Sequence, residues 1–146
     1  MSKAARALII ENGQILLMHR EKENNQYYTL VGGQVGDNET IEQALIRKVI
    51  DETGLNVTSY RLVFIEEHPA PYLEQYIYLC EIAPHNDVAL KSNTEESYLN
   101  RFGSNIHQPL WASIASFPSL PFRTPQLRQG IIDGLKHGFP KEPQKL

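Results

Sequence analysis

The chain is poor in cysteine, lacks any long apolar run and has no large excess of either charge. Cys80 is its only cysteine, so no disulfide can form within the chain. Its place in the apolar run 76–80 predicts a buried, unreactive thiol, which fits a reducing, cytoplasmic setting. No apolar stretch approaches the roughly 20 residues of a membrane span. The short apolar run 7–10 is cut off at once by Glu11-Asn12-Gly13, so no secretory signal is expected.

The charge balance excludes a strongly basic surface. The 146 residues contain 14 Lys and Arg against 17 Asp and Glu, a formal net charge of −3. General capture of DNA or RNA is therefore not expected, although this balance leaves room for a local basic pocket that binds a phosphate. The length and a hydrophobic content of 41% fit one globular domain over 1–146, with a core over about 4–137. The tail, 138–146, is expected to be loosely held.

Hydrophobic patterns and turn residues predict the order of the elements. Strands are expected at 5–10, 15–19, 27–31, 58–67, 75–82 and 109–114, and helices at 41–53 and 124–137. A polar loop is expected at 20–26, and an irregular segment at 84–108 with a short helical turn at 95–98. This order indicates an α/β (α+β) sandwich with a mixed sheet, because it is not a regular βαβ alternation.

The first of these helices has clear signals at both ends. Thr40 with Gln43 three residues later matches a capping box, so Thr40 is a plausible N-cap, with Asn38 as the alternative. Gly54 follows the last helical residue, where glycine adopts the left-handed conformation that ends many helices. The sequence therefore predicts a helix over 41–53.

Residues 33–55, which include this helix, contain a long pattern with fixed spacing. The pattern is Gly33, five residues, Glu39, seven residues, and then Arg-Lys-Val-Ile-Asp-Glu-Thr-Gly-Leu at 47–55. It resembles the Nudix box, a loop–helix–loop signature that ends in Arg-Glu-apolar-any-Glu-Glu-any-Gly-apolar. Lys48 departs from that pattern, and Asp51 keeps the charge of the family's glutamate on a shorter side chain.

The resemblance implies a Nudix-like α/β/α sandwich that contains this loop–helix–loop motif. It also implies hydrolysis of a phosphoanhydride bond in a nucleoside diphosphate linked to another group, with Mg2+ or Mn2+ as cofactor. By residue-by-residue transfer, Glu52 has the strongest claim to a metal and Asp51 the second, with the Gly33 carbonyl as a further ligand. Arg47 would orient these acids, while Glu39 would brace the loop or the helix start.

The chemistry and the helical spacing support this transfer independently. A pyrophosphate is anionic, so its hydrolysis needs divalent cations that neutralise charge and orient water, and magnesium prefers carboxylate oxygens. Positions 48 and 52 lie four apart, so they share a face, and this face lies between Ile41 and Leu45 and should turn towards the protein body. A charge placed there needs a partner or a cavity. Arg47 and Asp51 are also four apart, and a surface ion pair is the simpler interpretation of that pair.

Lys48 stands where the family has a glutamate that binds metal or acts as the base, and three interpretations follow. In the first, other acids substitute for the missing one. In the second, Lys48 itself binds a substrate phosphate, and in the third, hydrolysis is lost and a nucleotide-like ligand is merely bound. The spacing also allows Lys48 to pair with Glu52 and to occupy the carboxylate that a metal would need. The candidate substitute acids lie outside the box: Glu66, Glu67, Glu74, Glu81, Glu95 and Glu96.

In the family the variable part of the substrate lies in a cleft beyond the box. Candidate substrate-binding residues here are Arg20, Tyr28 and Gly33, with Arg6 and His19 as further phosphate contacts. The other aromatic candidates for stacking on a base are Tyr27, Tyr72, Tyr76, Phe102 and Trp111.

The expected partner is a small nucleotide-type substrate, with no membrane contact. Family members often dimerise, so the resemblance leaves a homodimer open. A non-catalytic nucleotide-binding module is the alternative function. An RNA-binding or regulatory scaffold is a third possibility, which the acidic balance disfavours.

Overall fold

The computed structural model describes residues 2–67, 74–89 and 105–146, which form two β-sheets and two α-helices. The first sheet is mixed, in the order β5-β1-β7-β6-β9. β1 pairs in parallel with β7, and β6 with β9, while the other neighbours are antiparallel. These strands are Lys3–Leu8 (β1), Val31–Gln34 (β5), Val57–Glu67 (β6), Glu74–Ile82 (β7) and Gln144–Lys145 (β9).

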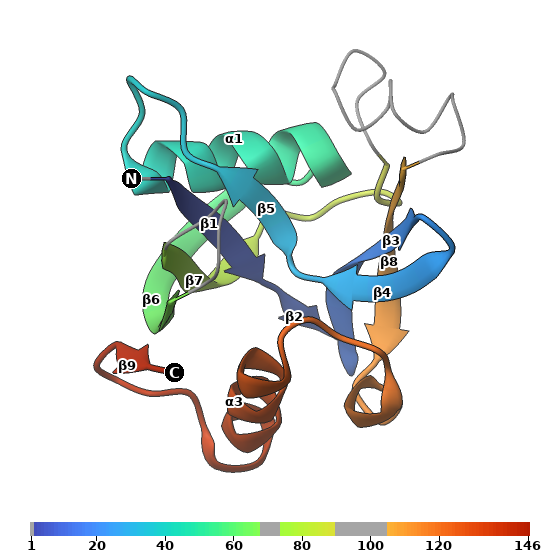
Figure 1. The fold of residues 1–146 in the computed structure, drawn as a ribbon. Helices are drawn as coiled ribbons and strands as arrows, with labels where there is room; N and C mark the ends of the chain where they lie inside the picture. The colour runs from blue at the N-terminus through green and yellow to red at the C-terminus, as the bar shows by residue number, and fades with distance from the viewer. Residues whose placement is uncertain (1, 68–73, 90–104) are drawn as a thin grey trace.

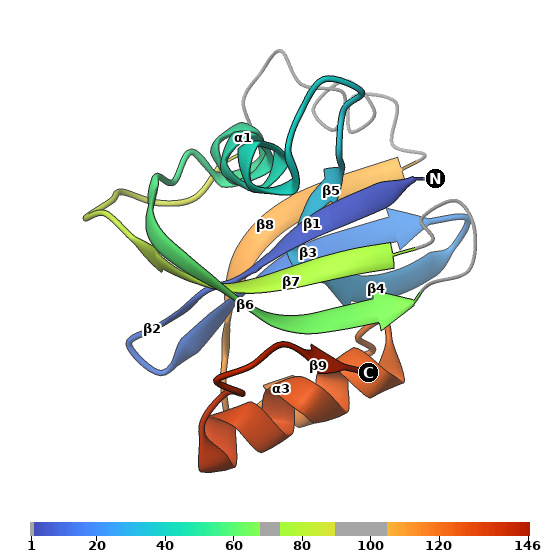
Figure 2. The same ribbon diagram turned by 90° about the vertical axis from the view of Figure 1, so that its left-hand side faces the viewer.

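The second sheet is antiparallel and centres on one long strand, β3 (Gln14–Lys22). On one side β3 pairs with β2 (Ile10–Glu11) and β4 (Asn25–Thr29), and on the other with β8 (Asn105–Ser113). The helices are α1 (Ile41–Thr53) and α3 (Pro125–His137), and a 3-10 turn, η1, covers Phe117–Ser119. α1 and α3 lie on opposite sides of the strands (Figures 1 and 2). The predicted α/β sandwich with a mixed sheet is therefore confirmed.

Two apolar clusters connect the helices to the strands. α1 buries Ala44, Leu45 and Val49 in a cluster that includes Ala5 and Ala7 of β1. α3 buries Leu127 and Ile131 in a second cluster with Leu8, Phe64 and Ile77. Because successive strand residues face opposite sides of a sheet, β1 contributes small residues to one cluster and Leu8 to the other. The alanines let α1 approach β1 closely, which sets the position of the box beside the sheet.

The ends of α1 are those that the sequence predicts. The Thr40 hydroxyl accepts a hydrogen bond from Gln43 N at 3.1 Å, and the Gln43 side chain accepts one from Thr40 N at 2.9 Å. Thr40 and not Asn38 is therefore the N-cap. Gly54 ends the helix with φ 78°, the left-handed conformation that glycine adopts at little cost.

Two expectations about the bounds of the strands were wrong. The predicted loop 20–26 is instead the end of β3, a turn at Glu23–Asn24 and the start of β4. Glu23 and Asn24 adopt φ 52° and 66° without any glycine that would signal the turn. β8 begins at Asn105 rather than 109, since it pairs with β3 along its whole length. Among the described residues β8 pairs only with β3, so it is an edge strand that tolerates Pro109.

The tail is packed rather than loose. Gln144 and Lys145 pair with β6, and Leu146 N donates to Ile65 O at 3.0 Å. Leu146 also packs against the second apolar cluster. The helical turn expected at 95–98 lies outside the described residues. No helix among the described residues is long and apolar enough to cross a membrane.

We predict that Thr40→Ala lowers the free energy of unfolding by about 1 kcal/mol, because it leaves the Gln43 amide without its acceptor. Thr40→Ser, which keeps the hydroxyl, should stay close to the unmodified protein. Urea unfolding followed by circular dichroism measures both, and equal losses in the two variants would contradict the capping interpretation.

Candidate functional site

The inner face of α1 carries a buried ion pair. The Glu52 side chain is 4% exposed and that of Lys48 is 14% exposed, which confirms that positions 48 and 52 turn towards the protein body. Glu52 Oε1 accepts a hydrogen bond from Gly32 N at 2.8 Å, and Lys48 Nζ lies 3.4 Å from Glu52 Oε2. Both carboxylate oxygens therefore have partners, as a buried charge requires.

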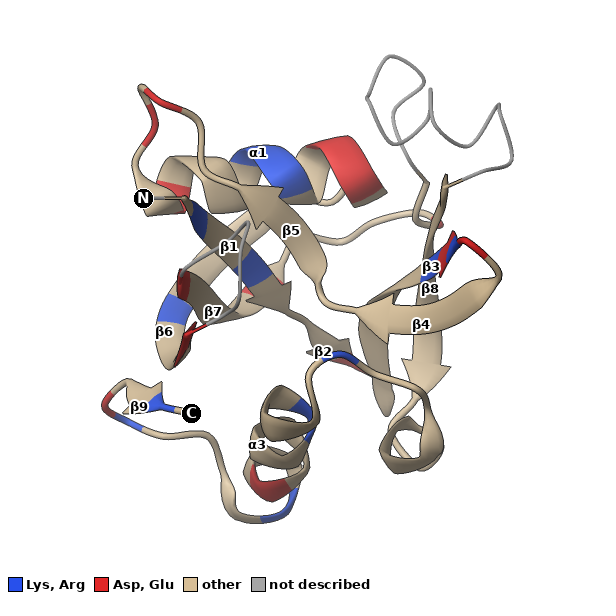
Figure 3. Ribbon diagram, viewed as in Figure 1, with Lys and Arg blue, Asp and Glu red and all other residues tan. Residues whose placement is uncertain are grey.

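The outer flank of α1 connects the helix to the loop before it. Arg47 binds Glu39 through two nitrogens, at 2.7 Å and 2.8 Å, and donates to Gln34 O at 3.3 Å. Glu39 also accepts from Gly36 N at 2.8 Å, so it braces the loop as expected. Asp51 lies on the same flank, with Oδ2 3.7 Å from Arg47 Nη1. Figure 3 shows the basic and acidic residues of α1 next to one another along the helix.

The guanidinium of Arg47 lowers the pKa of Glu39 from an ordinary value of 4.5 to about 2. Its hydrogen bonds to the carboxylate are the largest cause. Burial opposes them and raises the pKa, and the hydrogen bond from the Gly36 amide lowers it further. The folded state thus binds a proton at Glu39 less readily than the unfolded chain does. The stabilisation by this charge is present above pH 4.5 and is lost as the pH falls towards 2.

We predict that Glu39→Gln destabilises the protein at pH 7 and that this difference shrinks as the pH falls below about 4.5. Urea unfolding between pH 7 and 3 measures the difference. Glu142→Gln, at an exposed position in the tail, is the control and should leave the stability nearly unchanged throughout. If Glu39→Gln lowers the free energy of unfolding by the same amount at every pH in this range, the stabilising role of the Glu39 charge is contradicted.

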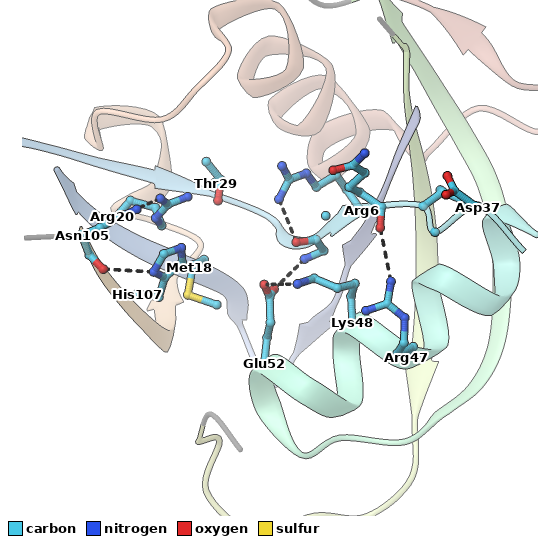
Figure 4. Close-up of a pocket in the computed structure, with 15 residues that line it drawn as sticks. Arg6, Met18, Arg20, Thr29, Asp37, Arg47, Lys48, Glu52, Asn105 and His107 are labelled. Atoms are coloured by element: carbon cyan, nitrogen blue, oxygen red, sulfur yellow. Dashed lines mark hydrogen bonds and ion pairs between the residues drawn. The ribbon is translucent and has the colours of Figure 1, made fainter. Parts of the chain in front are cut away.

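A pocket of about 500 Å³ opens between the inner face of α1, the loop that follows β5, and the ends of β3 and β8 (Figure 4). Four basic side chains line it, against two carboxylates. The basic ones are Arg6, Arg20, Arg47 and Lys48, and the carboxylates are Asp37 and Glu52. The balance of charge on the lining therefore favours an anionic ligand.

The far wall of the pocket is formed by β3 and β8, where Arg20 pairs with His107 in the strand register. Arg20 Nη2 donates to Asn105 Oδ1 at 2.8 Å, while Arg20 Nε is buried and has no hydrogen-bond partner among the described residues. His107 Nδ1 lies 3.2 Å from Asn105 O. The sequence pointed to Arg20 but missed Asn105 and His107, because only the register of β8 brings them there.

The pocket includes some of the predicted site residues and leaves others out. Gly33, Arg20, Arg47, Lys48 and Glu52 line it, and so does Arg6. The lining does not include Asp51, which lies at the outer flank of α1 near Arg47. The roles assigned to these residues stay predictions.

The aromatic candidates within the described residues do not line the pocket. Tyr28, predicted to bind substrate, packs against the second apolar cluster, with its ring centroid 5.1 Å from that of His19, and its role stays a prediction. Tyr27 lies under Arg123, whose Cζ is 3.7 Å from the ring centroid. The ring of Trp111 stacks on that of His85, with 5.8 Å between the two ring centroids. Tyr76 is not on the lining either, and Tyr72 and Phe102 lie outside the described residues. None of the aromatic side chains in the described parts of the chain lines the pocket.

A divalent cation fits poorly among the described residues. In the ranges 2–67, 74–89 and 105–146 no three His, Cys, Asp or Glu side chains are grouped so that they could hold a metal. Lys48 also stands beside the buried carboxylate. Two like unit charges about 4 Å apart repel by roughly 4 kcal/mol at an effective dielectric constant near 20, and a divalent ion would roughly double that figure.

The four substitute acids within the described residues do not fill this gap. Glu66, Glu67, Glu74 and Glu81 are absent from the lining of the pocket. Glu66 is buried on β6, where it accepts hydrogen bonds from Gln75, at 3.3 Å, and from Thr124. Glu95 and Glu96 lie outside the described residues.

Cys80, the lone cysteine, is buried on β7 as predicted. Burial raises the pKa of its thiol to about 12, so the thiolate is scarce near neutral pH. The pocket lining does not include it.

Comparison with known protein families gives one match that covers most of the chain. A family model described as the NUDIX domain matches residues 1–123. The NAD-capped RNA hydrolase NudC of Vibrio cholerae is 44% identical over 48 residues, 33% of this chain and 18% of the relative. That of Photobacterium profundum is 25% identical over 107 residues, 73% of this chain and 36% of the relative. The chain thus spans well under half the length of these curated relatives.

Solved structures share the fold. A Nudix hydrolase from Nitrosomonas europaea superposes with a TM-score of 0.71 at 19% identity, covering 94% of this chain and 90% of that one. An ADP-ribose pyrophosphatase from Streptococcus suis gives a TM-score of 0.61 at 17% identity, covering 99% and 98%. At these identities the likeness concerns the arrangement of strands and helices alone.

Proposed function

This chain belongs to the Nudix family, and on that premise we propose that it binds a nucleoside diphosphate linked to another group and hydrolyses its phosphoanhydride bond. The observation that carries the proposal is the pocket between the box helix and the sheet, whose lining holds more basic side chains than carboxylates. A diphosphate is the part of such a ligand that this charge would attract. The names of the relatives, NAD-capped RNA hydrolase and ADP-ribose pyrophosphatase, suggest ADP-ribose and NAD as first substrates to test.

In this proposal the basic side chains on two walls of the pocket position the phosphates. Lys48 on α1 and Arg20 on β3 both line the pocket, and the buried Nε of Arg20 would gain an acceptor that no described residue supplies. Arg47 acts indirectly, because its bonds to Glu39 and Gln34 O hold the loop that forms one rim. Water attacks one phosphorus, the bridging P–O bond breaks, and a carboxylate accepts the proton. Asp37 and Glu52 are the carboxylates on the described lining.

Nudix hydrolases generally use divalent metals, and the proposed cofactor here is Mg2+ or Mn2+. A bound metal would neutralise phosphate charge and orient water. The predicted ligands, Glu52, Asp51 and the Gly33 carbonyl, do not form such a site as they stand, since Lys48 occupies one side of Glu52. Metal binding therefore stays a prediction, and it requires Lys48 to move away from that carboxylate.

We predict that the purified protein with Mg2+ or Mn2+ releases AMP from ADP-ribose or from NAD, with ribose 5-phosphate or nicotinamide mononucleotide as the second product. Chromatography of the products measures the reaction. Arg20→Gln, which removes a cation from the pocket wall, should lower the turnover by about tenfold, while Lys136→Gln on the distant α3 should not. No AMP with either metal from either substrate would contradict the hydrolase proposal for these ligands.

A second candidate is a binding module without hydrolytic activity, and the Lys48–Glu52 pair is the observation that favours it. Lys48 is the counterion of the buried Glu52 carboxylate, and the described residues contain no group of three His, Cys, Asp or Glu side chains that could hold a metal. The two candidates differ in the role of Lys48: a phosphate contact in a working site, or a substitution that disabled the site.

Lys48→Glu separates the two candidates. If Lys48 contacts the substrate, we expect turnover to fall by about tenfold, because a charged contact is lost and a like charge replaces it. A large gain in turnover or in metal affinity would instead show that the native site is degraded, and would support the binding module. Lys136→Glu, exposed on α3, is the matched control for the change in net charge.

A further inference from the structure

The ammonium group of Lys48 is held in a defined place rather than extended into solvent. Its Nζ lies 3.4 Å from Glu52 Oε2, and the side chain is only 14% exposed. Lys48 belongs to the pocket lining together with Gly32 and Gly33 (Figure 4). A fixed cation therefore stands on the pocket side of the box helix.

Strand β5, opposite Lys48, leaves space for that cation. A Cβ built on Gly33 would lie 2.8 Å from Lys48 Cε and 3.4 Å from Nζ. Real Cβ atoms do not approach a neighbour to 2.8 Å, so a side chain at this position would displace the lysine. The lysine stem and the Gly33 backbone thus lie against each other, and the ammonium comes close to the backbone expected to supply a metal ligand.

A second cation faces the pocket from the other wall. Arg20 is fixed by Asn105, and its Nε is buried without a partner among the described residues. Lys48 and Arg20 come from α1 and β3, on either side of the pocket. A diphosphate has anionic oxygens on both of its phosphates, so one ligand can meet both cations.

We propose that Lys48 takes the place of a divalent cation, so that the pocket binds the diphosphate of a nucleoside diphosphate derivative without a metal ion. The class of ligand rests on the proposed function. The inference concerns the binding of this ligand and not its hydrolysis. An ammonium has three N–H donors, so it can serve Glu52 and a phosphate together. A divalent ion at the same place would meet a like charge.

The test compares the binding of ADP to the intact protein in EDTA and in Mg2+ by isothermal titration calorimetry. We expect dissociation constants that agree within about threefold, a difference of less than 1 kcal/mol. Binding that appears only with Mg2+, or that is at least tenfold tighter with it, would overturn the inference and leave the proposed function standing. No binding of ADP or ADP-ribose in either buffer would overturn the proposed function and the inference together.

Lys48→Met tests the residue itself, because methionine keeps much of the stem and removes the charge. In EDTA we expect ADP affinity to fall by at least about tenfold, whereas Lys136→Met should keep the affinity of the unmodified protein. Unchanged affinity in Lys48→Met would overturn the assignment. Circular dichroism checks the fold of the variant, and the EDTA comparison on the unmodified protein decides the matter if the variant does not fold.

Discussion

The buried carboxylate of Glu52 is the contact on which the arrangement of the box depends. It joins α1 to β5 through Gly32 N, and it joins two turns of α1 through Lys48. Removing one partner of a buried ion pair typically costs about 3–5 kcal/mol, because the other charge is left uncompensated. Gly32 adopts φ 139°, and a Cβ at this position would lie 2.0 Å from Ala5 O. The glycine therefore allows β5 to pass close to β1 while its amide donates to Glu52.

The two flanks of α1 have different physical tasks. The outer flank uses the exposed Arg47 and its two-point contact with Glu39, which fixes the loop between β5 and the helix. The inner flank uses a pair that is largely shielded from water, so its charges act strongly on whatever enters the pocket. The contact between Arg47 and Glu39 shapes the rim of the pocket, and the pair of Lys48 and Glu52 sets the electrostatic potential inside it. The inner pair follows from the four-residue spacing of the helix, whereas the outer contact joins the helix to a residue outside it.

Local signals in the sequence predicted α1 and its surroundings well. Thr40, Gln43 and Gly54 mark the helix ends by contacts within a few residues, and the four-residue spacing predicted that Glu52 would be buried. Features that depend on distant pairing were missed. Asn105 and His107 reach the pocket only because β8 aligns with β3, and the tail is packed because β6 offers it an edge and the second apolar cluster receives Leu146. The packing of Tyr28 against that cluster likewise depends on residues distant in the sequence.

Position 48 shows that the fold of this family can be kept while the charge of a residue in the box is reversed. With an acid at both 48 and 52, the inner face of α1 would hold two carboxylates one turn apart, which repel each other unless a cation lies between them. With Lys48 the same face carries one charge of each sign, and Glu52 has its counterion within the chain. Folding therefore needs no metal ion to neutralise the inner face of α1. The hydrolysis of a phosphoanhydride still needs cations that neutralise the charge of the phosphates. A chain with this ion pair can keep the Nudix fold and a pocket lined mainly by basic side chains, whether or not it catalyses metal-assisted hydrolysis.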